Sequence, residues 1–205
     1  MEGLILSKTR FGNSGNSVCV GGIALQNNQH VRLLNPGARY QFADTKFNIG
    51  DIWDIRFTSS AAIKEPHNED VIIQSQNYLR TINNLREFIL NIGIKIWRGS
   101  IDNIFEGKLR WANSGSCFLS VNFPDYPIHS VGFWLSDKLL SYKHDHYFYP
   151  TGNFFIKRKL KYKGIPEPVP IIKENTLIRV SLAKWWKPAD SHDEARCYLQ
   201  LSGWY

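Results

Sequence analysis

A short motif occurs twice in this chain, as KLRWANSG at residues 108–115 and as KTRFGNSG at residues 8–15. Both copies have the order basic, any residue, Arg, aromatic, small, Asn, Ser, Gly, and an apolar run follows each of them. The copies lie 100 residues apart, and residues 131–134 match residues 31–34 at the same offset. Similarity at a fixed spacing is the sequence signature of a repeated structural unit.

The correspondence continues farther along the chain at an offset of 125 residues. WDIRF at 53–57 then faces IRVSL at 178–182, and HNE at 67–69 faces HDE at 192–194. Short Asn-Ser-Gly hairpins also recur by chance in β-rich proteins, but four matches in the same order favour an internal duplication.

This alignment makes three structural predictions. Arg10 is expected to be equivalent to Arg110, and Trp53 to Ile178. The change of offset from 100 to 125 predicts that the second copy carries an insertion of 25 residues within about 136–175.

The chain is long enough for two domains of about a hundred residues each, and its 43% hydrophobic residues supply two small cores. Short apolar runs between closely spaced turn residues predict strands, whereas residues 83–92 have helical spacing. We therefore predict an all-β fold with one connecting helix, in two tandem small barrels related by internal duplication. Residues 1–95 form the first, with a linker helix at about 83–92, and residues 96–205 form the second.

The composition excludes several classes of protein. No segment reaches eighteen consecutive apolar residues, and the amino terminus has no signal-peptide pattern, so we expect a soluble cytoplasmic protein without a membrane partner. Cys19, Cys117 and Cys197 are scattered through apolar runs, which indicates buried thiols and no zinc ribbon. The net charge of +7 suits a polyanion such as nucleic acid, although many ordinary proteins share it.

The carboxyl-terminal part of the chain resembles a known family. LIRVSLAKWW at 177–186 and RCYLQLSGWY at 196–205 look similar to the terminal signature of the prokaryotic dual OB-containing domain proteins, and so do LSKTR at 6–10 and VGFWL at 131–135. The resemblance covers essentially the whole chain. It implies two OB-like barrels, a nucleic-acid-binding role and an association with anti-phage conflict systems, and it brings no catalytic residues.

The repeated motif supplies the first candidate contact residues. On an extended strand Lys8 and Arg10 share a face, as do Lys108 and Arg110, and Trp111 lies beside the second pair. Cations can meet phosphates while a ring stacks on a base. The alternative is that the aromatic residues belong to the core and the cations are merely solvated.

A row of lysines supplies the second candidate. Lys157, Lys159 and Lys161, with Lys163 beyond them, lie on one face of a predicted strand at intervals of roughly 6.6 Å. Such a row can follow a phosphate backbone. Lysines also protect the edge strands of sheets from pairing with other chains, and this alternative stays open.

The third candidate is the segment Lys184, Trp185, Trp186 and Lys187. In an OB fold this segment belongs to the loop between strands four and five, which borders the ligand groove. Adjacent side chains on a strand point opposite ways, so one Trp is expected in the core and the other exposed or packed between domains.

Recognisable catalytic and metal-binding motifs were not found. The chain has no phosphate-binding loop, no Gly-x-Ser-x-Gly elbow and no zinc-deaminase partner for His67 and Glu69. We therefore expect no cofactor, no metal and no enzymatic activity. The leading hypothesis is a nucleic-acid-binding module that serves a separate effector protein, and the alternatives are a protein-interaction adaptor with Trp-rich loops or an enzyme of unrecognised type.

Overall fold

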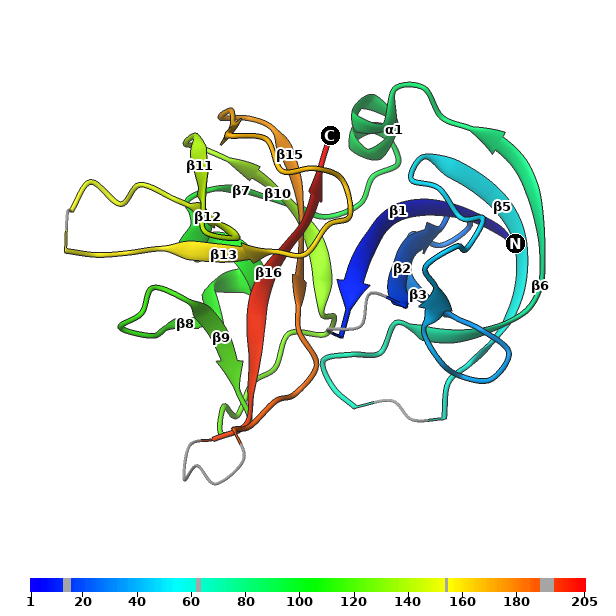
Figure 1. The fold of residues 1–205 in the computed structure, drawn as a ribbon, viewed down its shortest axis with the longest axis horizontal. Helices are drawn as coiled ribbons and strands as arrows, with labels where there is room; N and C mark the ends of the chain where they lie inside the picture. The colour runs from blue at the N-terminus through cyan, green and yellow to red at the C-terminus, as the bar shows by residue number, and fades with distance from the viewer. Residues whose placement is uncertain (13–15, 62–63, 154, 189–193) are drawn as a thin grey trace. The chain divides into compact units, whose positions relative to one another are not determined.

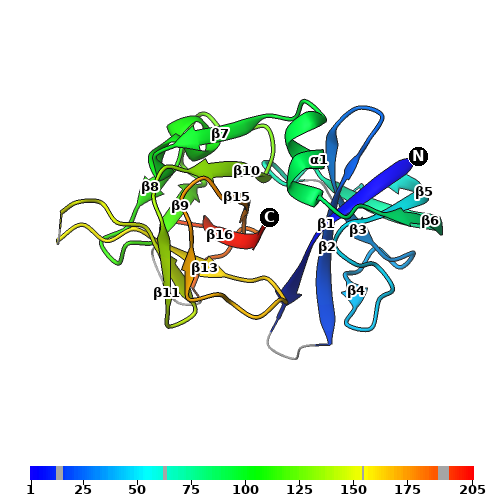
Figure 2. The ribbon, with the colours of Figure 1, turned by 90° about the horizontal axis from the view of Figure 1, so that it is seen from above.

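The computed structural model describes residues 1–12, 16–61, 64–153, 155–188 and 194–205. The chain divides into two compact units, Met1–Ile94 and Lys95–Tyr205, and strands dominate both of them (Figures 1 and 2). Residues 13–15 of the first motif, and His192 and Asp193 of the second HDE, lie outside the described residues. The three cysteines are free thiols, with Cys117 and Cys197 buried. No helix in the described ranges is long and apolar enough to span a bilayer.

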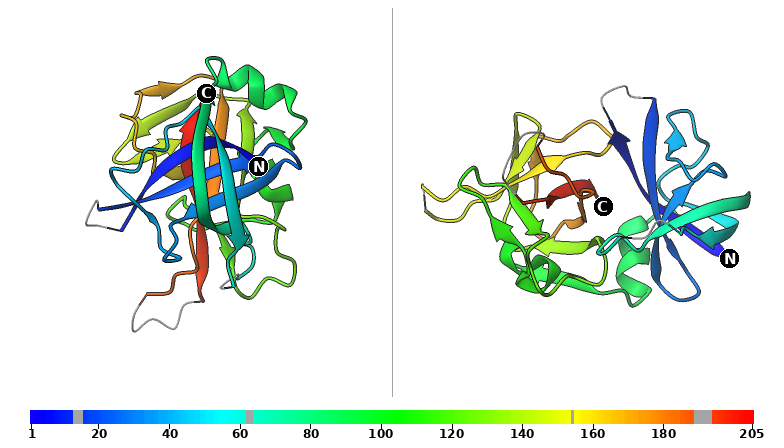
Figure 3. Two further views of the ribbon diagram at one scale, coloured as in Figure 1. Left: turned by 90° about the vertical axis from the view of Figure 1, so that its right-hand side faces the viewer. Right: turned by 90° about the horizontal axis from the view of Figure 1, so that it is seen from below.

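Unit 1 is a closed five-stranded barrel. Its elements are β1 (Glu2–Phe11), β2 (Ser17–Ala24), β3 (Gln29–Leu34), β5 (Asp51–Ser59) and β6 (Asp70–Thr81), with the short β4 (Gln41–Phe42) added to β2. β1 pairs with β2, β2 with β3, β6 with β5, and β5 with β1, all antiparallel, whereas β3 and β6 are parallel. This cycle is the OB topology, and Figure 3 shows the curled strands from two further sides.

The core of this barrel follows from alternation along the strands. Val18 and Val20 of β2 and Val31 and Leu33 of β3 point inward and are buried. Gly22 lies where the barrel wall turns tightly, because a Cβ there would lie 2.5 Å from the Leu4 carbonyl oxygen. The strand therefore requires glycine at this point.

The helix α1 (Leu85–Asn91) follows the barrel, within the segment that has helical spacing. Asn84 caps it by accepting a hydrogen bond from the Glu87 amide at 3.2 Å, and Gly93 follows with a φ of +75°. Ile89 is the buried residue of the helix.

Unit 2 repeats the same cycle of pairings with different spacing. Its first strand is split into β10 (Val131–Ser136) and β11 (Leu140–Lys143), and the others are β12 (His146–Phe148), β13 (Lys159–Tyr162), β15 (Leu177–Leu182) and β16 (Arg196–Trp204). β10 pairs with β15, β11 with β12, β12 with β13, and β15 with β16, all antiparallel. The parallel pair is β13 with β16. The all-β dual OB architecture predicted from the sequence is confirmed.

Four further strands and a 3-10 helix extend unit 2. β7 (Ile96–Gly99) runs parallel to β10, and β14 (Ile171–Ile172) pairs with β11. Along the chain, β7 is followed by η1 (Ile101–Gly107) and by the hairpin of β8 (Arg110–Trp111) and β9 (Cys117–Ser120), which precede β10. β9 pairs with residues 196–198 of β16, so this hairpin widens the sheet of the barrel.

The strand pairings correct the predicted alignment of the two copies. Arg10 lies in β1, the first strand of its barrel, but Arg110 lies in β8, outside the barrel cycle. The two motifs are therefore not equivalent in the fold. The octapeptide repeat reflects hairpin chemistry instead, since Gly115 adopts a φ of +85° in the turn between β8 and β9.

The later part of the alignment, at an offset of 125 residues, pairs equivalent strands of the two barrels. Trp53 lies in β5 and Ile178 in β15, which are the fourth strands of their barrels. Residues 136–175 are not an insertion, however, because they contain β11, β12 and β13, three segments of the barrel cycle. The two units are equivalent in their strand topology and in their fourth strands, but not in the octapeptide motif.

Candidate nucleic-acid interface

The lysines of β13 face outward from the second barrel. Leu160 and Tyr162 are buried in the core, and Lys159 and Lys161 alternate with them on the opposite face. β13 is paired on both sides, with β12 and with β16, so it is not an edge strand. Edge protection therefore does not explain these lysines.

The lysines extend into a row along one side of the barrel. Lys157 precedes the strand and is exposed, and Lys163 follows it, half-buried, with its backbone N–H donating to the Leu201 carbonyl at 3.0 Å. We call Lys157, Lys159 and Lys161 the lysine row. A strand or hairpin arm was expected over residues 154–163, but the strand covers only Lys159–Tyr162; residues 155–158 lie outside it, and residue 154 is outside the described residues.

β12 and β11 add more side chains to the same face. Phe148 lies opposite Lys159, and His146 lies opposite both Lys161 and Lys143. Directly opposed residues point to the same side of a sheet. Three lysines thus surround an aromatic ring and an imidazole on the outward face of strands one to three.

Two histidines of this region, His144 and His146, lie at the turn between β11 and β12. His144 and Asp145 have φ values of +47° and +60°, which is the pattern of a two-residue turn joining β11 to β12. His146 Nδ1 lies 2.6 Å from the His144 carbonyl oxygen. No group of three potential metal ligands occurs among the residues that the structure describes.

A second row, of aromatic side chains, lies along β16 and β9. Tyr198 and Phe118 are directly opposed, with ring centroids 6.0 Å apart, and the Trp186 ring lies 6.3 Å from Tyr198. The Arg196 guanidinium lies 4.3 Å from the Phe118 ring centroid. We call Trp186, Tyr198 and Phe118 the aromatic row. It shares the outward face with the lysine row, because Gln200, two residues beyond Tyr198, is paired with Lys161.

The loop between β15 and β16 holds the tryptophan pair. Trp186 is 55% exposed, and its backbone N–H and C=O pair with the backbone of Arg196 at 3.0 and 2.8 Å. Trp185 is half-buried against the core, and its ring lies 5.5 Å from Tyr126. The outward Trp of the pair is therefore Trp186. Lys184 is half-buried and Lys187 is exposed.

The cation pair of the second motif differs from its prediction. Lys108 is not on a strand: it caps the end of η1 with helical φ and ψ of −75° and −5°, and its Nζ lies 2.8 Å from Asp125 Oδ1. Only Arg110 lies on β8 with an outward side chain, 4.6 Å from the Phe123 ring. The strand begins only at Arg110, because the chain turns at residues 105–107, which have positive φ values, and the two cations are therefore not aligned.

Trp111 is a structural anchor rather than an exposed stacking surface. Its Nε1 donates to Asp102 Oδ1 at 2.7 Å, and the Arg158 guanidinium lies 4.2 Å from its ring centroid. The Nε of Arg158 also lies 3.7 Å from Asp102 Oδ1. This trio fixes the point at which the chain enters β13.

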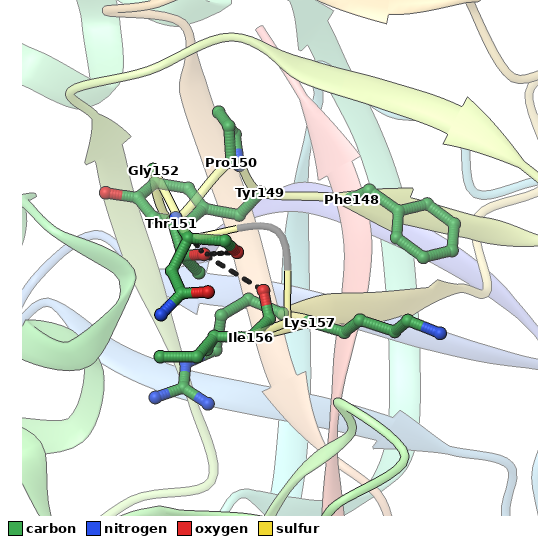
Figure 4. Close-up of a pocket in the computed structure, with 9 residues that line it drawn as sticks. Phe148, Tyr149, Pro150, Thr151, Gly152, Ile156 and Lys157 are labelled. Carbon is green, nitrogen blue, oxygen red and sulfur yellow. Dashed lines mark hydrogen bonds between the residues drawn. The ribbon is translucent and has the colours of Figure 1, made fainter.

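A pocket of about 380 Å³ lies beside that point, and Figure 4 shows residues that line it. It is formed by the connection between β12 and β13. Thr151 Oγ1 donates to the carbonyl oxygens of Asn153 at 3.0 Å and Ile156 at 2.9 Å. The Phe148 ring and the Lys157 side chain extend to the same side of the connection, so Lys157 continues the face described above.

In unit 1, the predicted contact residues lie near the end of β1. Lys8 and Arg10 share a face as expected, but Lys8 Nζ donates to the Thr45 carbonyl at 3.3 Å and is half-buried. Arg10 is exposed, and the neighbouring Phe11 ring stacks on Tyr40 with a centroid distance of 3.7 Å. Burial raises the pKa of Tyr40 to about 12.

β3 and β13 are the third strands of their barrels. β13 carries outward lysines, whereas β3 carries Arg32, whose charge is neutralised by carboxylates. Arg32 is buried, with its guanidinium 2.8 Å from Asp70 and 3.9 Å from Glu69. Burial alone lowers the pKa of Arg32, but electrostatic interaction with Cys19 and with the carboxylates of Asp70 and Glu69 raises it above its ordinary value. The outward faces of the two barrels therefore differ, since the charge of β3 is compensated internally.

Several site residues escaped the sequence reasoning. They are Lys143, Phe148, Phe118, Arg158, Arg196 and Tyr198. The alternation of Arg196, Tyr198 and Gln200 with Cys197, Leu199 and Leu201 could have marked the outward side of β16. The contributions of β9 and β12 depend on pairings between distant segments, which no local pattern indicates.

Comparison with known proteins agrees with this topology. The family model described as dual OB-containing domain matches residues 1–204. No match was found to a curated protein or to a solved structure.

Proposed function

Because the chain belongs to the dual OB-containing domain family, we propose that it is a nucleic-acid-binding module whose contact surface is the outward face of the second barrel. One observation carries the proposal. The lysine row and Phe148 lie on β12, β13 and the connection between them, and Trp186 lies in the loop between β15 and β16. In OB folds the second and third strands and the loop between strands four and five bind oligonucleotides.

The chemistry of the face suits a polyanion with aromatic bases. Lys143, Lys159 and Lys161 offer three ammonium groups to phosphates. The exposed Trp186, with Tyr198 beside it, offers a surface on which bases stack, worth about 1–3 kcal/mol for each stacked base. Positive charge and aromatic area thus lie on one side of one sheet.

The proposal is tested by electrophoretic mobility with single- and double-stranded DNA and RNA. Lys159→Ala with Lys161→Ala should weaken binding to all sequences alike, and should flatten the plot of log K against log salt by about 1.4 units for a single strand. The matched control is Lys46→Ala with Lys64→Ala, which removes two exposed lysines of unit 1. Equal affinity and equal salt dependence in both double variants would remove β13 from the interface.

The proposal extends to the role of the module. We propose that it is a non-enzymatic recognition or accessory subunit for a separate effector protein in anti-phage defence, which the family resemblance supports. Purification from the native host after high salt and nuclease should retain a stoichiometric protein partner. Loss of that partner on nuclease treatment would mean that nucleic acid, and not the module, holds the effector.

The second candidate function is a protein-interaction adaptor, which the exposure of Trp186 favours. An adaptor and a nucleic-acid module respond differently to salt, because counterion release belongs to polyanion binding. An effector that binds the purified chain without nucleic acid, and that is lost with Trp186→Ala but not with the double lysine variant, would favour the adaptor.

A further inference from the structure

The connection between β12 and β13, described at residues 149–153 and 155–158, projects from the second barrel (Figures 1 and 2). We call it the arm. Phe155 on the arm is 91% exposed, the largest fraction among the exposed large hydrophobic side chains of the described ranges. So little of this ring is covered that it contributes almost nothing to the core. A single exposed ring needs no explanation by itself, but two further observations concern this one.

The first observation is that the arm is fixed at its base. Arg158 is held between the Trp111 ring, at 4.2 Å, and Asp102. The backbone N–H of Lys159 donates to the Gly115 carbonyl at 2.8 Å. Gly115 allows this approach, because a Cβ there would lie 2.8 Å from the Lys157 Cβ.

The arm is also fixed next to its exposed ring. The Phe155 N–H donates to Asn153 Oδ1 at 2.9 Å, and Thr151 Oγ1 donates to the Ile156 carbonyl at 2.9 Å. These bonds hold the backbone on both sides of the ring. A backbone held in place at Phe155 loses less conformational entropy when the ring binds.

The second observation is the continuity of charge. Lys157 lies two residues from Phe155, and the lysine row leads from the arm onto the outward face of β13. The cations therefore form a line toward the barrel instead of surrounding the tip of the arm. A line of charges fits a chain of phosphates better than a flat anionic surface.

From this arrangement we infer that Phe155 is a stacking finger for an unpaired base of single-stranded nucleic acid. The strand lies along the lysine row and continues onto the arm, where the Phe155 ring packs against the face of a base. The base must be unpaired because a duplex keeps its base faces stacked within the helix. This inference rests on the proposed function and specifies its ligand.

Fluorescence anisotropy with labelled oligothymidines of about 4 to 16 nucleotides tests the finger, since one OB fold covers that range. Phe155→Ala should weaken binding of the longer oligonucleotides by about 5- to 150-fold, without changing the salt dependence. It should bind the shortest ones like the unaltered chain, because these do not reach the arm. Phe155→Trp should retain affinity. Phe42→Ala is the matched control, since Phe42 is a 66% exposed ring in the other unit.

The outcomes separate the finger from the proposed function. If the unaltered chain binds no oligonucleotide, the proposed function itself fails. If it binds and Phe155→Ala matches it at every length, or Phe42→Ala loses as much, only the finger is rejected. Sedimentation with phosphatidylserine vesicles covers the remaining case: vesicle binding lost in Phe155→Ala, with oligonucleotide binding unchanged, would make the arm a membrane contact and reject the finger.

Discussion

The guanidinium of Arg158 lies 4.2 Å from the ring centroid of Trp111, and both side chains interact with Asp102. Through this contact the hairpin of β8 and β9 supports the segment that leads into β13. Residues of the sequence motif at 108–115 thus take part in the candidate site by fixing it.

Arg158→Ala should lower the free energy of unfolding by roughly 0.5–2 kcal/mol, because it removes a cation–π contact and an ion pair. Urea denaturation measures this change. Arg158→Lys should recover only part of it, since an ammonium lacks the planar surface that covers the ring. Lys157→Ala, which removes an exposed neighbour, is the control. A stability of Arg158→Ala equal to that of the control would show that the trio does not support the arm.

Lys108 and Arg110 should differ in their effect on nucleic-acid binding. Lys108 is already paired with Asp125, whereas Arg110 faces outward over Phe123. Arg110→Ala is expected to flatten the salt dependence of oligonucleotide binding by about 0.7 to 0.9 units, and Lys108→Ala to leave it unchanged. The reverse ranking, measured by anisotropy at several salt concentrations, would contradict the assignment of the outward face.

Trp185 and Trp186 should separate stability from binding. Trp186→Ala is expected to cost about 1–3 kcal/mol of oligonucleotide affinity at unchanged salt dependence, with little loss of stability because its ring is more than half exposed. Trp185→Ala is expected to lower the free energy of unfolding by roughly 1–3 kcal/mol, because its ring packs on the core. Thermal denaturation and anisotropy on both variants distinguish the two roles.

Arg32 should be essential for the stability of the first barrel. Arg32→Met leaves Asp70 and Glu69 buried without their cation, and the loss of one partner from a buried ion pair costs about 3–5 kcal/mol. Urea unfolding should show this loss, and Arg56→Met, at an exposed position of β5, should not. If Arg32→Met unfolds at the same urea concentration as the unaltered chain, the buried charges must be relieved in another way.

Glu194 should contribute a pH-dependent part of the stability of the second barrel. The Ser120 hydroxyl donates to the Glu194 carboxylate, with further hydrogen bonds from Arg196 and Asn122, and these hold the pKa of Glu194 below its ordinary value. A lowered folded-state pKa stabilises the fold above pH about 4.3, and this contribution is lost as the pH falls through the folded-state pKa.

Glu194→Gln is accordingly expected to be less stable than the unaltered chain at pH 7, and the two should converge in stability well below pH 4. Guanidinium unfolding at several pH values measures the difference. Glu174→Gln, at an exposed position, provides the control. A difference that stays constant between pH 3 and pH 7 would mean that the carboxylate charge of Glu194 is not what stabilises the fold.

Local patterns predicted what depends on neighbouring residues. The alternation of Lys159, Leu160, Lys161 and Tyr162 was read correctly because a strand with one buried face has a period of two. The opposite directions of Trp185 and Trp186 follow from the same rule. The family resemblance added the topology that these patterns could not supply.

Local sequence patterns could not show which strands of the two barrels are equivalent, because this depends on which distant strands pair. Residues 131–134 and 31–34 are both apolar strands, yet one belongs to the first strand of its barrel and the other to the third. Lys108 was misplaced for a different reason: Phe105, Glu106 and Gly107 adopt positive φ values, so the chain is still turning at Lys108, and no local pattern in the sequence indicates this.

The parallel pairing of β13 with β16 has a consequence for the synthesis of this protein. Lys161 is opposite Gln200, a residue that the ribosome adds 39 residues later. A nascent chain that has reached Pro188 already contains every lysine of the row, but the strand that flanks Lys161, and the Tyr198 and Arg196 side chains, have not yet been made. The outward face that carries the lysine row is therefore complete only after β16 has been synthesised.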